Sequence, residues 1–148
     1  MKSWQSIIIL GLMLSLLLTA CEIFPSQQPT SIVSIEDNIE DENGNPIDKS
    51  SAPFKVRVRG TVSNAQGLYL YLVVDDGNAQ WIQPGLGQNV EGDFEENVYL
   101  GIENDPDSLN KQYRIFAVVT DKEHRENEHL DRGRIKASSA EIDLFRKQ

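Results

Sequence analysis

Cysteine is nearly absent from this chain, because Cys21 is the single cysteine among 148 residues. One cysteine excludes an intramolecular disulfide, so a folded domain must be held by its apolar core alone. Positive charge is also scarce, with 14 Lys and Arg against 23 Asp and Glu and a net charge of −9. Such a surface repels nucleic-acid phosphates and anionic lipid headgroups alike. We therefore expect no nucleic-acid partner and no electrostatic attachment to a bilayer.

The common signatures of enzymes are missing as well. The sequence contains no GxSxG elbow, no phosphate-binding P-loop and no GxGxxG fingerprint. Carboxylates are plentiful, which leaves a paired Asp/Glu hydrolase open as a lesser alternative. The expectation is a protein that binds or supports and does not catalyse, with no catalytic residue assigned and no cofactor.

Long apolar runs are confined to the N-terminal region. Ile7 to Leu18 is apolar or small throughout and follows the single charge of Lys2. This run is shorter than the roughly 20 apolar residues that a membrane-spanning helix needs. The small residues Thr19 and Ala20 come next, as at the cleavage site of a secretory signal peptide. The sequence therefore predicts a signal peptide over residues 1–20.

The four residues Leu18-Thr19-Ala20-Cys21 resemble the lipobox of bacterial lipoproteins. The resemblance implies cleavage between Ala20 and Cys21, a diacylglycerol on the Cys21 thiol, and acylation of the new amino group by a fatty acid such as palmitate. Two or more acyl chains hold a protein stably on a membrane. The expected location is the cell membrane or outer membrane, facing the periplasm or the exterior, with an envelope protein or a surface polymer as partner.

The rest of the chain divides into a tether and one domain. Residues 21–30 carry the lipidation site and a stretch rich in Pro, Ser and Gln, which predicts a flexible tether. Residues 31–148 form the predicted β-domain, with its core over 52–148. Ser31 to Ile35 is an expected edge strand, and Asn43-Gly44-Asn45-Pro46 is an expected turn.

From Phe54 onward the sequence has the pattern of β-strands. Together with Ser31 to Ile35, the alternating or continuously apolar segments, separated by turn residues, predict about seven strands. No long amphipathic helix is present, so the expected fold is all-β, a single two-sheet sandwich. A short helical or irregular insertion is expected near 121–132, where charged residues follow a possible Asp121 cap. The expected strands after the first lie near 54–62, 68–74, 79–83, 94–100, 113–120 and 140–146.

The segment Tyr113-Arg114-Ile115-Phe116-Ala117-Val118 resembles one strand of immunoglobulin-like and fibronectin type III domains. In that pattern a tyrosine stands two positions before a core residue, which is often a cysteine; here that residue is Ile115. The resemblance implies an immunoglobulin-like sandwich without the disulfide and implies nothing about function.

Metal sites are not expected. His124 and His129 are five positions apart, whereas the HExxH zinc motif needs four, so this cluster is expected to be a solvated face. The segment Glu40 to Asn45 is not an EF-hand loop, because with Gly44 in the sixth place the first and twelfth places are Ile39 and Ser50, where carboxylates are required. Calcium binding by the acidic loop Glu103 to Asp107 remains an alternative to a plain solvated turn.

Two further groups of side chains have alternative interpretations. Trp81, Tyr69, Tyr71 and Tyr99 could form a platform that stacks on a glycan, or could simply fill the core. Lys55, Arg57 and Arg59 form a basic stripe along one strand, which could dock a partner or pair with Glu95 and other acidic neighbours. The principal hypothesis is a lipid-anchored binding or structural module; the alternative is a calcium- or carbohydrate-binding module.

Overall fold

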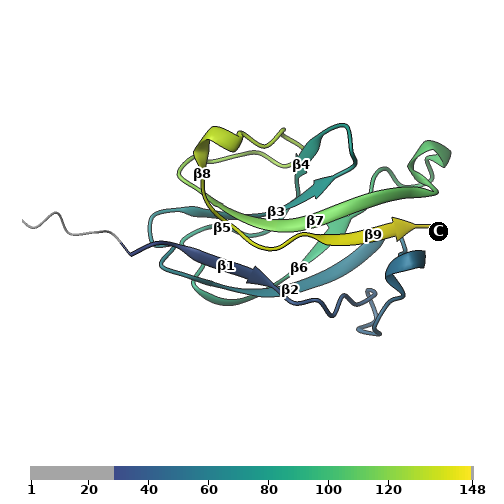
Figure 1. Cartoon of the computed structure of the whole chain (residues 1–148), viewed down its shortest axis with the longest axis horizontal. Coiled ribbons are helices and arrows are strands. Elements are labelled where there is room, and N and C mark those ends of the chain that lie inside the picture. The colour runs from purple at the N-terminus through teal and green to yellow at the C-terminus, as the bar shows by residue number, and fades with distance from the viewer. Residues whose placement is uncertain (1–28, 148) are drawn as a thin grey trace, which may run out of the picture.

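Two antiparallel β-sheets packed face to face form the structure, a computed structural model that describes residues 29–147 (Figure 1). The smaller sheet has the order β1-β2-β6, and the larger has the order β4-β3-β7-β8, with β5 paired to β3 and β9 paired to β7. The strands are β1 (Ile32–Ile35), β2 (Lys55–Ser63), β3 (Tyr69–Asp75), β4 (Gln80–Ile82), β5 (Gly87–Gln88), β6 (Gly92–Tyr99), β7 (Lys111–Thr120), β8 (Ile135–Ser138) and β9 (Ile142–Arg146). Short 3-10 helices η1 (Lys49–Ser51), η2 (Pro106–Ser108) and η3 (Arg132–Arg134) connect them.

The predicted all-β sandwich is confirmed, with nine strands in place of about seven. The additional strands are β5 and β8. β5 has only two residues, and β8 follows a charged stretch of sequence without alternation of apolar and polar residues. The insertion after β7 is irregular and not helical: no α-helix occurs within residues 29–147. The Asp121 carboxylate caps no helix there but lies 2.6 Å from Lys136 Nζ, in the following strand β8.

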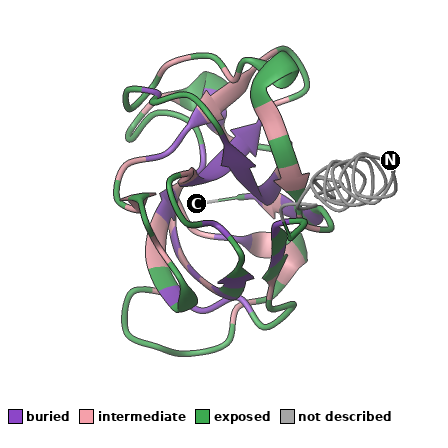
Figure 2. Ribbon diagram, turned by 90° about the vertical axis from the view of Figure 1, so that its left-hand side faces the viewer, coloured by how far each residue is buried: buried purple, intermediate pink, exposed green. Residues whose placement is uncertain are grey.

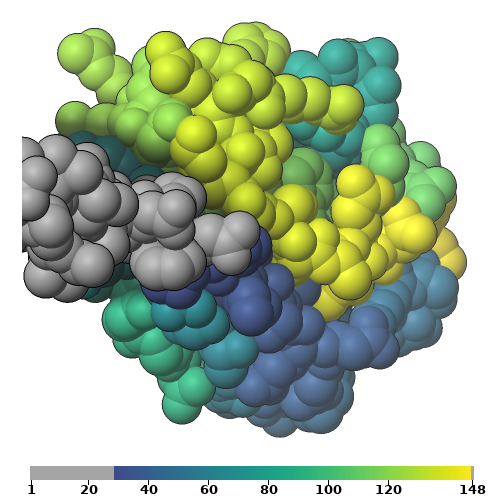
Figure 3. Space-filling model, turned by 60° about the vertical axis from the view of Figure 1, so that its left-hand side comes forward, coloured from purple at the N-terminus to yellow at the C-terminus, as the bar shows by residue number. Residues whose placement is uncertain are grey.

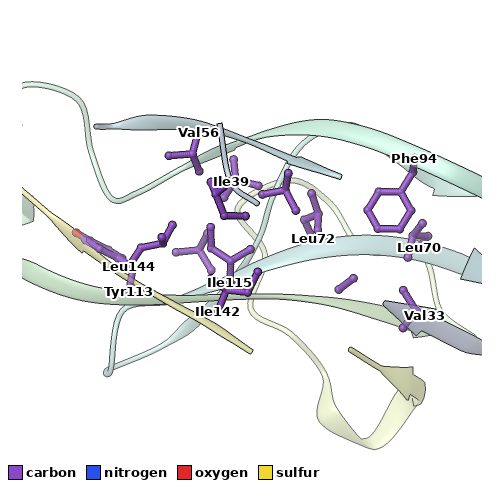
Figure 4. Packing of buried hydrophobic residues seen from close by; sticks show 14 of the residues in the cluster. Val33, Ile39, Val56, Leu70, Leu72, Phe94, Tyr113, Ile115, Ile142 and Leu144 are labelled. Atoms are coloured by element: carbon purple, nitrogen blue, oxygen red, sulfur yellow. The ribbon is translucent and has the colours of Figure 1, made fainter. Parts of the chain in front are cut away.

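The main core fills the space between the two sheets. Alternate residues of β2 and β6 point toward alternate residues of β3, β7 and β9, and they are almost completely buried (Figure 4). Figure 2 shows that buried residues concentrate on the facing strands, whereas the connecting loops are mostly exposed. Each fully buried aliphatic side chain contributes about 1.5–3 kcal/mol. The core-facing set is Val56, Val58, Val62, Leu70, Leu72, Val74, Phe94, Val98, Tyr113, Ile115, Ala117, Val119, Ile142 and Leu144.

The larger sheet also buries part of its outer face. Tyr71 and Val73 on β3 pack there with Phe116 and Val118 on β7 and with Ile82 on β4. Leu130 and Ile135 lie against this second cluster. Burial on both faces explains why the β3 sequence is apolar at both parities, with leucines toward the main core and tyrosines outward.

β1 forms an edge of the smaller sheet, as expected, and lies beside the C-terminal strands on the surface (Figure 3). Its partner β2 carries Gly60 opposite Ile35. A Cβ at Gly60 would lie 2.1 Å from the Ser34 carbonyl oxygen and 2.5 Å from the Phe94 ring. The absence of a side chain at this position lets β1 and the Phe94 ring approach the β2 backbone closely.

A buried tyrosine closes one end of the sandwich. The Tyr113 hydroxyl donates a 3.0 Å hydrogen bond to the Ser108 carbonyl, which precedes β7. The hydroxyl thus bonds back to the backbone five residues before the tyrosine, an arrangement hereafter called the tyrosine corner. Gly101 passes over the hydroxyl with φ +82°, and a Cβ there would lie 2.5 Å from the phenolic oxygen. The corner therefore fixes the whole connection between β6 and β7.

Replacing Tyr113 with Phe should lower the free energy of unfolding by about 1–2 kcal/mol, because the buried Ser108 carbonyl loses its donor. Urea unfolding followed by circular dichroism measures the difference. Tyr69→Phe is the matched control, since the Tyr69 hydroxyl has no hydrogen-bond partner within residues 29–147. Equal stability of the two variants would show that the corner does not stabilise the fold.

Candidate functional site

Two of the four aromatic residues singled out above meet in one cavity. Trp81 on β4 and Tyr99 at the end of β6 line a cavity of about 500 Å³, hereafter the Trp81 pocket. Its lining also includes the tyrosine corner and the loop that follows β6. The volume lies within the range of about 300–1,000 Å³ that is typical of small-molecule sites. Of the four aromatics in the alternative platform interpretation, this pair lines one cavity.

The Trp81 pocket lies at one end of the sandwich. β2 pairs with Ile32 at its Ser63 end and with Tyr99 at its Lys55 end, so these two residues are separated by the length of this strand. Nine residues of strand span roughly 27 Å. In Figure 1 the start of β1 and the loop that contains η2 accordingly lie at opposite ends of the molecule.

β4, which carries Trp81, is bonded to a strand on one side and to a loop on the other. β4 pairs with β3, and its other edge exchanges backbone hydrogen bonds with the loop before β8: Ile82 N–H donates to Glu128 O at 3.0 Å, and Asn127 N–H donates to Ile82 O at 2.9 Å. The indole packs against the His129 ring, with ring centroids 4.1 Å apart. The insertion 121–131 therefore completes the pocket by fixing its tryptophan.

Tyr99 links the two sheets at this end. Its backbone N–H donates a 2.8 Å hydrogen bond to Gln83 Oε1, just beyond β4. Its ring contacts Phe54 at a centroid distance of 5.4 Å, and the Arg146 guanidinium lies 4.9 Å from the Phe54 centroid. Because these contacts come from both sheets, the Tyr99 ring is positioned relative to Trp81 by the sandwich itself.

The loop after β6 forms the rim of the pocket. Arg146 Nη1 donates to the carbonyl oxygens of Leu100 and Ile102 at 2.7 and 2.9 Å. The Asp105 carboxylate accepts hydrogen bonds from Asp107 N–H and from the Ser108 hydroxyl, which caps η2. Ile102 nevertheless remains 67% exposed. A well-anchored loop thus presents an apolar side chain to solvent beside the pocket.

The polar lining of the pocket is mixed and mostly acidic. The carboxylates are Asp76, Asp105 and Glu126, and Lys111 is the one basic residue among the described residues that line it. Asp76 Oδ1 accepts the N–H groups of Asn78 and Ala79, which fixes the β3–β4 turn. The pocket therefore offers hydrogen-bond acceptors and a few donors, and its charge disfavours an anionic ligand.

Asp75 fixes the hairpin that carries Trp81. It is buried, and its carboxylate accepts hydrogen bonds from Gly77 N–H, Gln80 Nε2 and Arg114 Nη2 at 2.8, 2.9 and 2.8 Å. Burial acts to raise the pKa of Asp75. The hydrogen bonds from Gln80 and Gly77 and the charge of Arg114 outweigh burial, so the pKa lies below its ordinary value.

The other two aromatic residues lie outside the Trp81 pocket. Tyr69 and Tyr71 stack on the outer face of β3 with centroids 6.3 Å apart, and Tyr71 belongs to the second apolar cluster. Burial is the largest effect on the Tyr71 hydroxyl and raises its pKa. The interpretation of all four aromatics as one platform is therefore wrong, because β3 turns this pair toward the insertion.

The prediction that the histidine cluster is a solvated face is wrong for His124. Its side chain is completely buried, its backbone N–H donates to the Tyr71 hydroxyl at 2.9 Å, and its ring meets the Tyr71 ring edge-on at 5.7 Å. His129 is exposed, as expected. Nothing in the sequence indicated this burial directly, because the neighbours of His124 are charged. The apolar outer face of β3, with its two tyrosines, did indicate that another segment must cover it.

The basic stripe is paired with acidic residues, as one of its two interpretations predicted. Arg59 Nε lies 2.6 Å from Glu95 Oε2, directly across the β2–β6 ladder, and Arg59 Nη1 lies 2.7 Å from Glu40 Oε1. Arg57 Nε lies 3.5 Å from Glu95, and Lys55 Nζ lies 3.9 Å from Glu42. Pairing with Glu95 across the ladder and with Glu40 and Glu42 in the loop after β1 thus accounts for the charges of the stripe.

The acidic loops serve as turns. Asp41 accepts the backbone N–H groups of Asn43 and Asn45, and Asp105 is committed to the η2 cap. Between residues 29 and 147, no group of three or more His, Cys, Asp or Glu side chains is placed to hold a metal ion. Ala20 and Cys21, the predicted cleavage and lipidation residues, lie outside the described residues.

No protein-family profile, curated protein or solved structure matches this chain. The site must therefore be interpreted from its own geometry. Within residues 29–147, no helix has the length and apolar character needed to cross a bilayer.

Asp75→Asn should lower the free energy of unfolding at pH 7 by about 1–3 kcal/mol, because a charge-assisted network loses its acceptor. A depressed folded-state pKa stabilises the protein above the unfolded value of about 3.9, and this contribution is lost as the pH falls through the folded value. The difference between wild type and variant should therefore shrink below about pH 4.

Urea unfolding at pH 7 and at pH 3 checks this expectation. Asp93→Asn, an exposed carboxylate on β6, is the control and should have little effect at either pH. A deficit in Asp75→Asn that is equally large at both values would contradict the assigned ionisation.

Proposed function

We propose that this chain is an extracytoplasmic lipoprotein whose β-sandwich is a non-enzymatic binding module of the bacterial envelope. The observation that carries the proposal is the sequence Leu18-Thr19-Ala20-Cys21 after the apolar run Ile7 to Leu18. Cleavage after Ala20 and acylation of Cys21 would leave two or more acyl chains as the membrane anchor, in the cell membrane or in the outer membrane. The module faces the periplasm or the exterior.

The geometry of the sandwich supports a binding role at the end away from this anchor. Residues 22–30 separate Cys21 from the domain and reach at most roughly 30 Å when fully extended. The chain enters the sandwich beside β1, whereas the Trp81 pocket lies at the other end of β2. An acyl anchor would therefore hold the domain by one end and leave the pocket free to meet an envelope protein or a surface polymer.

Of the alternative ligands, a glycan has more support than calcium. Trp81 and Tyr99 share a pocket with hydrogen-bonding side chains. Among the residues that the structure describes, the acidic loops form no cluster of three potential metal ligands. Hydrolysis has no specific support, because the Asp105 carboxylate in the pocket is engaged in a helix cap.

Cys21→Ala should abolish acylation and either release the protein from the membrane fraction or leave it as an uncleaved precursor. Palmitate labelling, cell fractionation and the intact mass of the protein report these outcomes separately. Ser26→Ala, in the tether, is the control and should remain labelled, processed and membrane-bound. Recovery of processed Cys21→Ala protein in the membrane fraction at the wild-type level would refute the anchor.

A further inference from the structure

We propose that the Trp81 pocket binds an uncharged glycan chain, with its sugar rings packed on the Trp81 and Tyr99 side chains. This inference rests on the proposed binding role and specifies its ligand class. It follows from three properties of the pocket: its aromatic surfaces, its mixture of hydrogen-bonding groups and its charge.

The aromatic surfaces are exposed to the pocket and fixed in position. The C–H faces of sugar rings are apolar and pack well on flat aromatic rings, which also supply large contact areas at a low entropic cost. His129 holds the indole, and Phe54 supports the Tyr99 ring. Ile102 adds an exposed apolar side chain on the rim. Because these groups are ordered before binding, little entropy is lost in arranging them.

The polar lining suits hydroxyl groups, which both donate and accept hydrogen bonds. Asp76 Oδ1 accepts two backbone N–H groups and Glu126 Oε1 accepts a 3.5 Å hydrogen bond from Asn127 Nδ2, so the second oxygen of each carboxylate is the acceptor offered to a ligand. Lys111 in the lining provides a donor. Gln83 Oε1 is occupied by Tyr99 N–H, so Gln83 Nε2 is a further donor held in a fixed amide. Donors and acceptors around an aromatic surface match the alternating apolar faces and polar edges of a sugar.

Charge separates an uncharged glycan from other ligands that bind aromatic surfaces. Three carboxylates and one lysine line the pocket of a chain with a net charge of −9, which repels nucleic acids, uronate or sulfated glycans and anionic headgroups. Aromatic rings and carboxylates also attract a quaternary ammonium, but the charge of Lys111 in the lining opposes it. A neutral polyhydroxyl ligand avoids both penalties.

The surface continues beyond one sugar unit. Tyr99 also lines a neighbouring cavity of about 620 Å³, together with Phe54, Lys55 and Glu103. Tyr99 lines both cavities, and Phe54, which lines only the second, is in ring contact with it. This arrangement fits a chain that lies across Tyr99, and it predicts that a hexasaccharide binds more tightly than the corresponding disaccharide.

Intrinsic fluorescence of Trp81 tests the proposal. The full chain in detergent, with Trp4→Phe so that Trp81 is the sole tryptophan, is titrated with the hexasaccharides of cellulose, starch and chitin and with anionic hexagalacturonate. We expect a saturable change with at least one neutral hexasaccharide and weaker or no binding of the anionic one. Tyr99→Leu should weaken binding about tenfold, equivalent to about 1.4 kcal/mol.

Two further variants complete the design. Ile102→Ala removes an exposed side chain without disturbing the core and should weaken binding several-fold even where Tyr99→Leu fails to fold. Tyr69→Leu, the same substitution at a tyrosine on β3 that lines neither cavity, should leave binding unchanged. The proposal is overturned by the absence of a response to every neutral hexasaccharide, by preference for hexagalacturonate, or by equal affinity of wild type and Ile102→Ala. None of these measurements involves Cys21, so they test the glycan site independently of the membrane anchor.

Discussion

Burial of both faces of β7 is the constraint on which the rest of this structure depends. Its inner residues, from Tyr113 to Val119, meet the smaller sheet, while Phe116 and Val118 pack outward. It also pairs with β3, β8 and β9. Truncating one buried aliphatic or aromatic side chain costs about 2–5 kcal/mol, a large part of the 5–15 kcal/mol that stabilises a typical domain. With one cysteine in the chain, no internal disulfide can offset such a loss.

The pocket is an extension of this core. Tyr113 ends the inner face of β7 and anchors the loop before it, while Arg146 at the end of β9 anchors the loop after β6. Trp81 is positioned by the outer face of the larger sheet. The insertion that covers Tyr71 with His124 on this face also bonds to the free edge of β4. Side chains held by the core need little reorganisation on binding, so a pocket of this kind retains most of its contact energy as affinity.

The strands and their inner faces could be predicted because a period of two is a local property of the sequence. Leu70 and Leu72 point into the core, and the Arg59–Glu95 pair lies across neighbouring strands, as the alternation indicated. The meeting of Trp81 with Tyr99 was only partly predictable, because it depends on how the two sheets pack and not on either strand alone. His124 was misjudged for a similar reason, since its charged neighbours describe the loop surface while its burial depends on β3.

The distribution of charge and the direction of the chain act together in the proposed arrangement. An acidic domain is repelled by anionic headgroups, and within about a Debye length of the surface this repulsion opposes contact between the sandwich and the bilayer. Acyl chains on Cys21 would fix one end of the tether, and the tether joins the domain at β1. In this proposed arrangement the Trp81 pocket lies at the end of β2 opposite the point where the tether joins the domain, roughly 27 Å along the strand. An anchor that supplies all of the membrane affinity thus leaves the acidic pocket available for ligands beyond the bilayer surface.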